Sequence, residues 1–196
     1  ERLGRDTIEI AFIHDADSRV REAIDVVYPA LHAMREEGII KAIGIGMNWC
    51  PPSIAIMRET DLNIALIAGR YTLLDQSAQD ELYPLALAKN VSIIAAGVYN
   101  SGVLANPVQG ALYDYEIAPQ EILDRARAIA KFLEKFNVTL PQAALQFPLR
   151  HPAVASVLIG PGSLAELEAN IASFDAQLPD ELWSEMEREG LIRPIS

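Results

Sequence analysis

Cysteine, basic residues and long apolar runs are scarce in this sequence of 196 residues, and each shortage narrows the class of protein. Cys50 is the only cysteine, so it excludes an internal disulfide and favours a reducing, cytoplasmic compartment. The chain has 16 Lys and Arg against 27 Asp and Glu, a formal net charge of −11, which argues against nucleic acid or an anionic membrane as the main partner. No run approaches about 18 uninterrupted apolar residues, so no membrane span is predicted.

Several motifs of known chemistry are also missing. The sequence has no G-x-x-x-x-G-K-[ST] phosphate loop and no G-x-S-x-G nucleophile motif. The three histidines are far apart and Cys50 has no partner, so no metal site is predicted. His32 falls within a predicted helix and His151 in a helix-to-strand turn, and both are interpreted as structural. The glycines of Gly44–Gly46 lack a third glycine three positions on, so they favour close packing of a neighbouring side chain over a dinucleotide site.

The composition is that of a folded domain. Hydrophobic residues make up 51% of the chain and charged residues 22%, which is enough for a sizeable core. The sequence contains no low-complexity segment or clear linker, so we predict a single domain over residues 1–196. The opening ERLGRDT has no signal-peptide pattern and no initiator methionine, which we interpret as the start of a piece of a longer chain.

Strand-like and helix-like segments alternate along the chain. The strand candidates are almost continuously apolar, which is typical of a parallel sheet covered on both faces; they are residues 7–14, 40–47, 63–71, 91–99 and 154–160. Helices are predicted over residues 20–37, 53–60, 78–89, 119–136, 141–150, 163–174 and 179–189, with residues 100–118 as a loop. This order fits two α/β architectures, an open doubly wound sheet or part of a (β/α)₈ barrel. Five strands suit the open sheet if the chain is complete and are too few for a barrel of eight.

Polar residues gather where the predicted strands end, the edge at which parallel α/β folds place their chemistry. They are His14, Asn48, Arg70 with Tyr71, residues 99–102 and residues 160–163. His14 alone leaves two readings open, a satisfied core imidazole or a functional group. The segment VLIGPGSLAELEAN outlines a nucleotide-phosphate cradle, because its glycines admit a ligand and Ser163 can cap the helix behind them. Glycine-serine turns also precede helices without any ligand, so that reading stays open too.

Taken together, these stretches resemble the carboxyl-terminal part of the aldo-keto reductase family. The matching pieces are FIHDAD, REEGIIKAIGIGMN, GRYTLLDQ, IIAAGVYNSGVLA, LPQAALQFPLRHPAVASVLIGPGSLAELEAN and LPDELW. GRYTLLDQ and YNSGVLA are closest to the branch of aldose 1-dehydrogenases, such as L-fucose, D-threo-aldose and L-galactose dehydrogenases. The resemblance implies a (β/α)₈ TIM barrel of which this chain supplies about the last five βα units, strands four to eight. The family's catalytic Asp, Tyr and Lys belong to the missing part, and only its catalytic His has a counterpart here, His14.

The resemblance also implies a reaction and a set of site residues. A hydride would pass between C4 of a nicotinamide and a sugar-like hemiacetal or aldehyde carbon, while His14, as a neutral imidazole, would hydrogen-bond the substrate oxygen. The expected cofactor contacts are the nicotinamide carboxamide at Asn48, the pyrophosphate at Ser101 and Gly102, and the adenosine at Gly160, Gly162 and Asn170.

The sequence departs from the family pattern at four other positions. Met47 stands where a Ser is usual and Ala68 where a Gln is usual. Ala96 replaces the aromatic residue that commonly stacks on the nicotinamide, which leaves Tyr99 or Tyr71 as substitutes. Glu166 stands where NADP-preferring members often have Arg, and a carboxylate repels a 2′-phosphate but accepts from a ribose diol. NAD is therefore the expected cofactor, with NADP as the alternative.

Two functions of different classes follow from these patterns. The first is an NAD(P)-dependent aldose dehydrogenase of carbohydrate metabolism, inactive as this chain alone, with a small sugar or aldehyde substrate. The missing amino-terminal part of the barrel would then be its partner. The alternative is a non-catalytic nucleotide-binding module or truncated barrel. A self-contained open α/β domain with an unrelated ligand is a third reading, which no motif favours.

Overall fold

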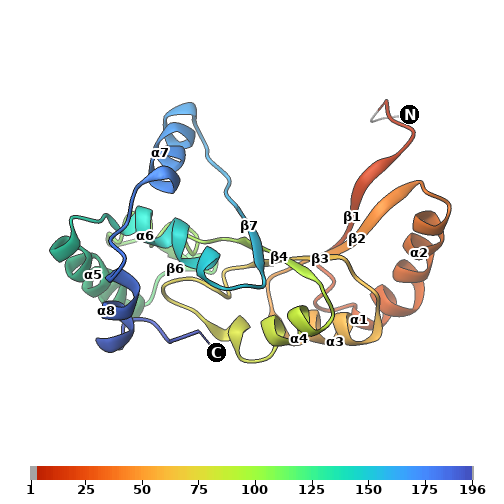
Figure 1. Ribbon diagram of the computed structural model, residues 1–196, viewed down its shortest axis with the longest axis horizontal. Helices are drawn as coiled ribbons and strands as arrows, with labels where there is room; N and C mark the ends of the chain where they lie inside the picture. The colour runs from red at the N-terminus through yellow and green to blue at the C-terminus, as the bar shows by residue number, and fades with distance from the viewer. Residues whose placement is uncertain (1–3, 196) are drawn as a thin grey trace.

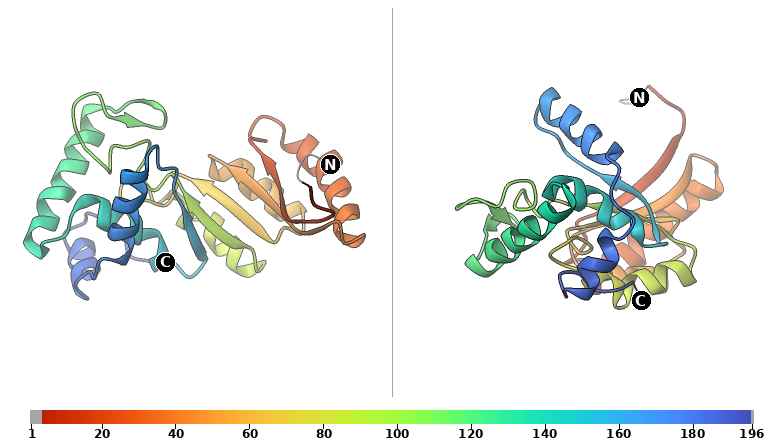
Figure 2. Two further views of the ribbon diagram at one scale, coloured as in Figure 1. Left: turned by 90° about the horizontal axis from the view of Figure 1, so that it is seen from above. Right: turned by 60° about the vertical axis from the view of Figure 1, so that its left-hand side comes forward.

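Five parallel strands form the main sheet of the protein, in a computed structural model that describes residues 4–195. The strands lie in the order β1-β2-β3-β4-β7 and are β1 (Ile8–His14), β2 (Ile40–Met47), β3 (Ile64–Ala68), β4 (Ser92–Ala96) and β7 (Val154–Leu158). Figure 2 shows them side by side. The order of the strands across this sheet is the same as their order along the chain. The parallel α/β sheet predicted from the apolar runs is confirmed. Residues 1–3 and 196, the ends of the predicted single domain, lie outside the described residues.

Helices connect the strands and continue beyond the last one (Figure 1). They are α1 (Val20–Glu22), α2 (Tyr28–Glu36), α3 (Cys50–Glu59), α4 (Leu82–Ala88), α5 (Gln120–Leu133), α6 (Leu140–Gln146), α7 (Leu164–Asp175) and α8 (Leu182–Arg188). A π-helical turn, Ala23–Val27, joins α1 to α2 within the predicted helix 20–37. Within residues 4–195, none of the helices combines the length and the apolar composition needed to cross a bilayer.

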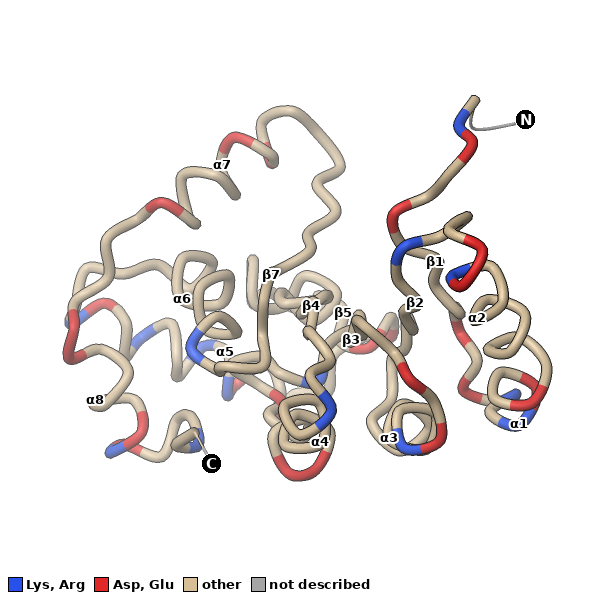
Figure 3. The backbone as a smooth tube through the Cα atoms, turned by 45° about the vertical axis from the view of Figure 1, so that its right-hand side comes forward, with Lys and Arg blue, Asp and Glu red and all other residues tan. Residues whose placement is uncertain are grey.

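The two faces of the sheet differ in burial. Helices α2, α3 and α4 pack on one face, where side chains such as Ile13 and Ile45 are buried. On the other face, Ile8, Ile10 and Phe12 of β1 remain 38%, 38% and 36% exposed. Figure 3 shows that the charged residues lie mainly on helices and loops, while β3, β4 and β7 carry none. The sequence pattern predicted cover on both faces, and that prediction is wrong for this open face.

Strands β3, β4 and β7 end earlier than predicted, and glycine explains the first two of these ends. β3 ends at Ala68 because Gly69 takes a φ of +73°, and β4 ends at Ala96 because Gly97 takes a φ of +60°. Left-handed backbone of this kind breaks the extended ladder and favours glycine. In both places the strand ends three residues earlier than the apolar runs suggest, and Arg70 and Tyr99 lie in the turns rather than in the strands.

The loop predicted over residues 100–118 contains a small β-hairpin that the sequence analysis missed. Its strands are β5 (Leu112–Tyr113) and β6 (Glu116–Ile117), and they pair antiparallel. The turn residues Asp114 and Tyr115 have φ values of +49° and +68°, the left-handed geometry of a tight two-residue hairpin. The hairpin therefore places Asp114 and Tyr115 at its tip.

Candidate active site

His14 is the last residue of β1, and the glycines of β2 make room beside it. It lies opposite Gly46 in the sheet, where an added Cβ would come within 2.9 Å of the His14 ring. A Cβ at Gly44 would come within 2.7 Å of the Phe12 ring. The interpretation of Gly44–Gly46 as a packing feature is confirmed. The side chain of His14 is 70% exposed on the open face, with Nδ1 3.0 Å from a carboxylate oxygen of Asp15, so within residues 4–195 it is not a buried core imidazole.

A cavity of about 710 Å³ lies beyond the carboxyl ends of β4 and β7. It gathers six of the eight predicted cofactor residues along its wall: Tyr99, Ser101, Gly102, Gly160, Glu166 and Asn170. Gly162 does not line it, but its backbone N–H donates to the Glu166 carboxylate at 2.7 Å. Segments about 60 residues apart in the sequence thus meet at one site, as the parallel topology requires.

Two contacts order the wall of this larger cavity. The Tyr99 hydroxyl donates to Oδ1 of Asn170 at 2.8 Å, which links the turn after β4 to α7. Burial raises the pKa of Tyr99, so its hydroxyl keeps the proton that it donates. Ser163 caps α7 by accepting from the backbone N–H of Glu166, as predicted. The N–H of Gly162 already donates to the Glu166 carboxylate, so this part of the predicted anion cradle is not free to bind a phosphate.

A smaller cavity of about 240 Å³ adjoins the first, since Gly97 and Ser101 line both. Asn48, the predicted carboxamide contact, lines it at the end of β2. Its other polar residues include Arg70, Asn100 and Asp114, of which the sequence analysis singled out only Arg70 and the 99–102 turn. Asn100 is buried, and its Oδ1 has no hydrogen-bond partner among the described residues. A buried acceptor of this kind is available to an N–H or O–H group of a ligand.

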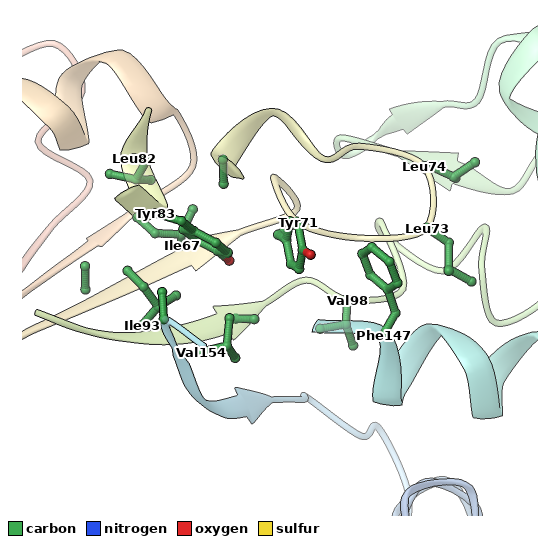
Figure 4. Packing of buried hydrophobic residues seen from close by; sticks show 14 of the residues in the cluster. Ile67, Tyr71, Leu73, Leu74, Leu82, Tyr83, Ile93, Val98, Phe147 and Val154 are labelled. Atoms are coloured by element: carbon green, nitrogen blue, oxygen red, sulfur yellow. The ribbon is translucent and has the colours of Figure 1, made fainter. Parts of the chain in front are cut away.

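Tyr71 is not available to any ligand in these cavities. Its ring is buried and packs on Tyr83 and on Phe147, with centroids 4.9 Å apart in the pair with Phe147 (Figure 4). It also packs edge-on against His151. Burial raises its pKa to about 12. Of the two aromatic substitutes predicted for the stacking position, Tyr71 is therefore wrong, and Tyr99 alone of the two borders a cavity.

The sheet, its helices and the position of the site define a class of protein. The sequence profile of the aldo/keto reductase family matches residues 1–189, so this chain belongs to that family. The fold agrees, because the structure of an aldo-keto reductase from Bacillus halodurans in its holo form superposes with a TM-score of 0.74. That match has 22% sequence identity and covers all of this chain and 62% of the other.

Two curated relatives are more similar to this chain in sequence than that structure is. The chain is 38% identical to pyridoxal 4-dehydrogenase of Microbacterium luteolum and 39% identical to D-threo-aldose 1-dehydrogenase of a Pseudomonas species. Each alignment covers 98% of this chain and 59% of the relative. The chain thus spans about three fifths of the length of the curated relatives that it matches.

Proposed function

We propose that the full-length protein is an NAD(P)-dependent oxidoreductase of the aldose 1-dehydrogenase type. The observation that carries this proposal is the pair of adjoining cavities at the carboxyl ends of the strands, where the predicted cofactor residues meet. Membership of the aldo/keto reductase family and the likeness to D-threo-aldose 1-dehydrogenase support the reaction class. A nicotinamide nucleotide would supply the hydride acceptor for oxidation at the sugar carbon.

The residues present fit such a cofactor. The larger cavity offers Ser101 and Gly102 for the pyrophosphate, with Gly160 and Asn170 for the adenosine, while the smaller cavity offers Asn48 for the carboxamide. Gly162 lies outside the lining and would act on the adenosine end only through Glu166. Asn100 lines the smaller cavity, and its Oδ1, which has no partner among the described residues, would supply a further acceptor there. In this proposal the two cavities form one continuous dinucleotide groove.

His14 would orient the substrate. Its ring stands free on the open face beside Gly46, and the contact of Nδ1 with Asp15 leaves Nε2 to face a substrate oxygen. Because a carboxylate only accepts, Nδ1 donates in the contact with Asp15, and Nε2 of a neutral ring would accept a hydrogen bond from the hydroxyl of a hemiacetal substrate. In this role His14 holds the substrate oxygen in place and does not itself accept the hydride.

The open face and α7 would receive the rest of the barrel. Besides β1, apolar side chains are exposed along one stripe of α7, at Leu164, Leu167, Ile171 and Phe174. Strands β1 and β7 are the two edges of the sheet, and unpaired edges and apolar faces of this kind need cover. We propose that this chain supplies the last five βα units of a (β/α)₈ barrel and that three further units pair with these edges.

The function is tested on the full-length protein with NAD, against a panel of L-fucose, D-arabinose, a D-threo-aldose and pyridoxal. We expect NADH to form with at least one aldose and His14→Ala to lower kcat. Binding of NADH without turnover of any substrate would favour the non-catalytic nucleotide-binding module. The 196-residue chain alone should show no turnover, because the family's Asp, Tyr and Lys have no counterpart in it; measurable turnover by it would refute this part.

Glu166 would set the preference for NAD over NADP. Its carboxylate lines the larger cavity and is fixed by the Gly162 amide, so a 2′-phosphate placed there would meet a fixed negative charge. Glu166→Arg should shift the ratio of kcat/KM towards NADP, whereas Glu166→Gln, which keeps the size and an acceptor oxygen, should shift it less. Equal or better NADP turnover by the unmodified protein would sink this assignment.

A further inference from the structure

Arg70 makes four contacts at the end of the sheet, and together they join three separate segments. Its side chain is only 9% exposed. Nε donates to the backbone carbonyl of Asn48 at 2.9 Å, Nη1 donates to Asp75 at 2.9 Å, and Nη2 donates to Asp114 at 2.6 Å. The guanidinium also lies over the ring of Trp49, with Cζ 4.2 Å from its centroid. Arg70 thus ties the end of β2 to the turn after β3 and to the β5–β6 hairpin.

Arg70 and its two carboxylate partners, Asp75 and Asp114, form a partly buried cluster of opposite charges. Burial alone would lower the pKa of the guanidinium, but the hydrogen bond with Asp114 and the charges of Asp114 and Asp75 outweigh it and raise the pKa. A buried ion pair of this kind is strongly destabilised when one partner is removed, because the remaining charge is left without compensation. Arginine suits the position because its planar fork donates in several directions at once, which lysine cannot do.

Polar contacts hold the tip of the hairpin, residues Asp114 and Tyr115, in position. Its tip is held by the ion pair between Arg70 and Asp114 and by the Tyr115 backbone N–H, which donates to Oγ of Ser101 at 3.0 Å. Of the apolar side chains of the hairpin, Tyr113 packs against the core, but Tyr115 at the tip is 77% exposed and Ile117 is 70% exposed, so the tip itself depends on its polar contacts. Loss of the Arg70–Asp114 pair would therefore free the tip on one side.

The residues that Arg70 joins surround the smaller cavity. Asn48 and Trp49 line it from the end of β2, Asp114 and Tyr115 from the hairpin, and Arg70 itself from between them. The buried Asn100, with its unpaired Oδ1, completes the polar lining. The Arg70 guanidinium therefore bonds to both segments that line this cavity, the end of β2 and the hairpin.

We propose that Arg70 is a positioning residue for the nicotinamide half of the cofactor. It fixes Asn48 through the Asn48 carbonyl and holds the hairpin over the smaller cavity through Asp114. This inference rests on the proposed function, because Asn48 contacts the carboxamide only if the groove binds a nicotinamide nucleotide. Arg70 touches no reacting atom and acts through these two residues.

The test compares two ligands on the full-length protein by calorimetry, NADH and ADP-ribose, which lacks the nicotinamide. Arg70→Met should weaken NADH binding by at least about tenfold and change ADP-ribose binding by less than about twofold, because Arg70 lines the smaller cavity and not the larger one. Arg70→Lys, which keeps the charge without the fork, should fall between Arg70→Met and the unmodified protein. Asp114→Asn keeps Arg70 paired with Asp75 and should weaken NADH binding selectively, to a smaller degree than Arg70→Met. If Arg70→Met does not fold, the result with Asp114→Asn decides the test.

Arg127→Met is the matched control, since Arg127 also holds the 100–118 segment, by donating from Nε to the Pro107 carbonyl, but lines neither cavity. It should leave both affinities unchanged. If the Arg70 variants weaken both ligands equally, or neither, Arg70 is only structural and the inference is overturned while the proposed function stands. If the unmodified protein binds neither ligand, the proposed function itself falls, and this inference falls with it.

Discussion

Replacing His151 by glutamine should remove a pH dependence of stability that the buried imidazole builds into the fold. The ring is 1% exposed and packs edge-on against Tyr83, with centroids 4.8 Å apart. Nδ1 accepts from the backbone N–H of Ala153 at 3.1 Å, so the neutral ring carries its proton on Nε2. A second proton would have to sit on Nδ1, against that N–H. Burial accordingly lowers the pKa of His151.

The sign and size of the effect follow from linkage. In the unfolded chain a histidine has a pKa of about 6.5, so above that pH both states are neutral and the contribution to stability is complete. As the pH falls below about 6.5 the unfolded state binds a proton that the folded state refuses, and the free energy of unfolding decreases. The loss between pH 7.5 and pH 5.5 is at most about 1.4 kcal/mol, the limit set by the unfolded chain alone. It levels off once the pH passes below the lowered pKa of the folded state.

Urea unfolding at intervals between pH 5.5 and 7.5 measures this loss directly. His151→Gln keeps an acceptor for the Ala153 N–H but cannot titrate, so its stability should vary less over the range, by up to about 1.4 kcal/mol, whatever the substitution does to the absolute value. His32→Gln is the control, because it removes a histidine from α2 and leaves His151 in place. An unchanged pH dependence in His151→Gln would show that the ring accepts its proton in the folded state and would refute the reasoning.

Three further substitutions test the packing and the site. Gly44→Ala should lower the free energy of unfolding by about 1–3 kcal/mol, since the new Cβ would lie 2.7 Å from the Phe12 ring, and a neutral result in urea would contradict that contact. Tyr83→Phe should leave stability unchanged or raise it by about 1 kcal/mol, because the buried hydroxyl has no partner among the described residues; a clear loss would reveal a bond. Tyr99→Phe removes the bond to Asn170 and should cost about 1 kcal/mol in thermal or urea unfolding. In the same variant ADP-ribose binding should weaken, and unchanged affinity would show that this bond does not shape the larger cavity.

The sequence was sufficient to predict the main sheet, because strands such as β3 and β4 are apolar throughout and are separated by amphipathic helices. The strand ends at Gly69 and Gly97 could not be predicted, because an isolated glycine in an apolar run gives no sign of the backbone angle that it adopts.

The candidate site divides in the same way. Residues at strand ends, such as Asn48 and Ser101, could be singled out because a parallel topology brings those ends together, whereas the role expected of Glu166 came only from the family resemblance. The hairpin was missed because strands of two residues carry no periodicity, and the role of Asp114 depends on Arg70, which lies 44 residues earlier in the chain. Tyr71 was misjudged because its place next to a strand end says nothing about which way its ring points.

The fit between His14 and Gly46 has a consequence for how related sequences vary. A ring at position 14 and a Cβ at position 46 compete for the same space, with 2.9 Å between them. The two positions therefore form one evolutionary unit: a homologue that acquires a side chain at the second must shrink or displace the first. In an alignment they should change together or stay fixed together, and a library that randomises both should recover active clones only in compatible pairs.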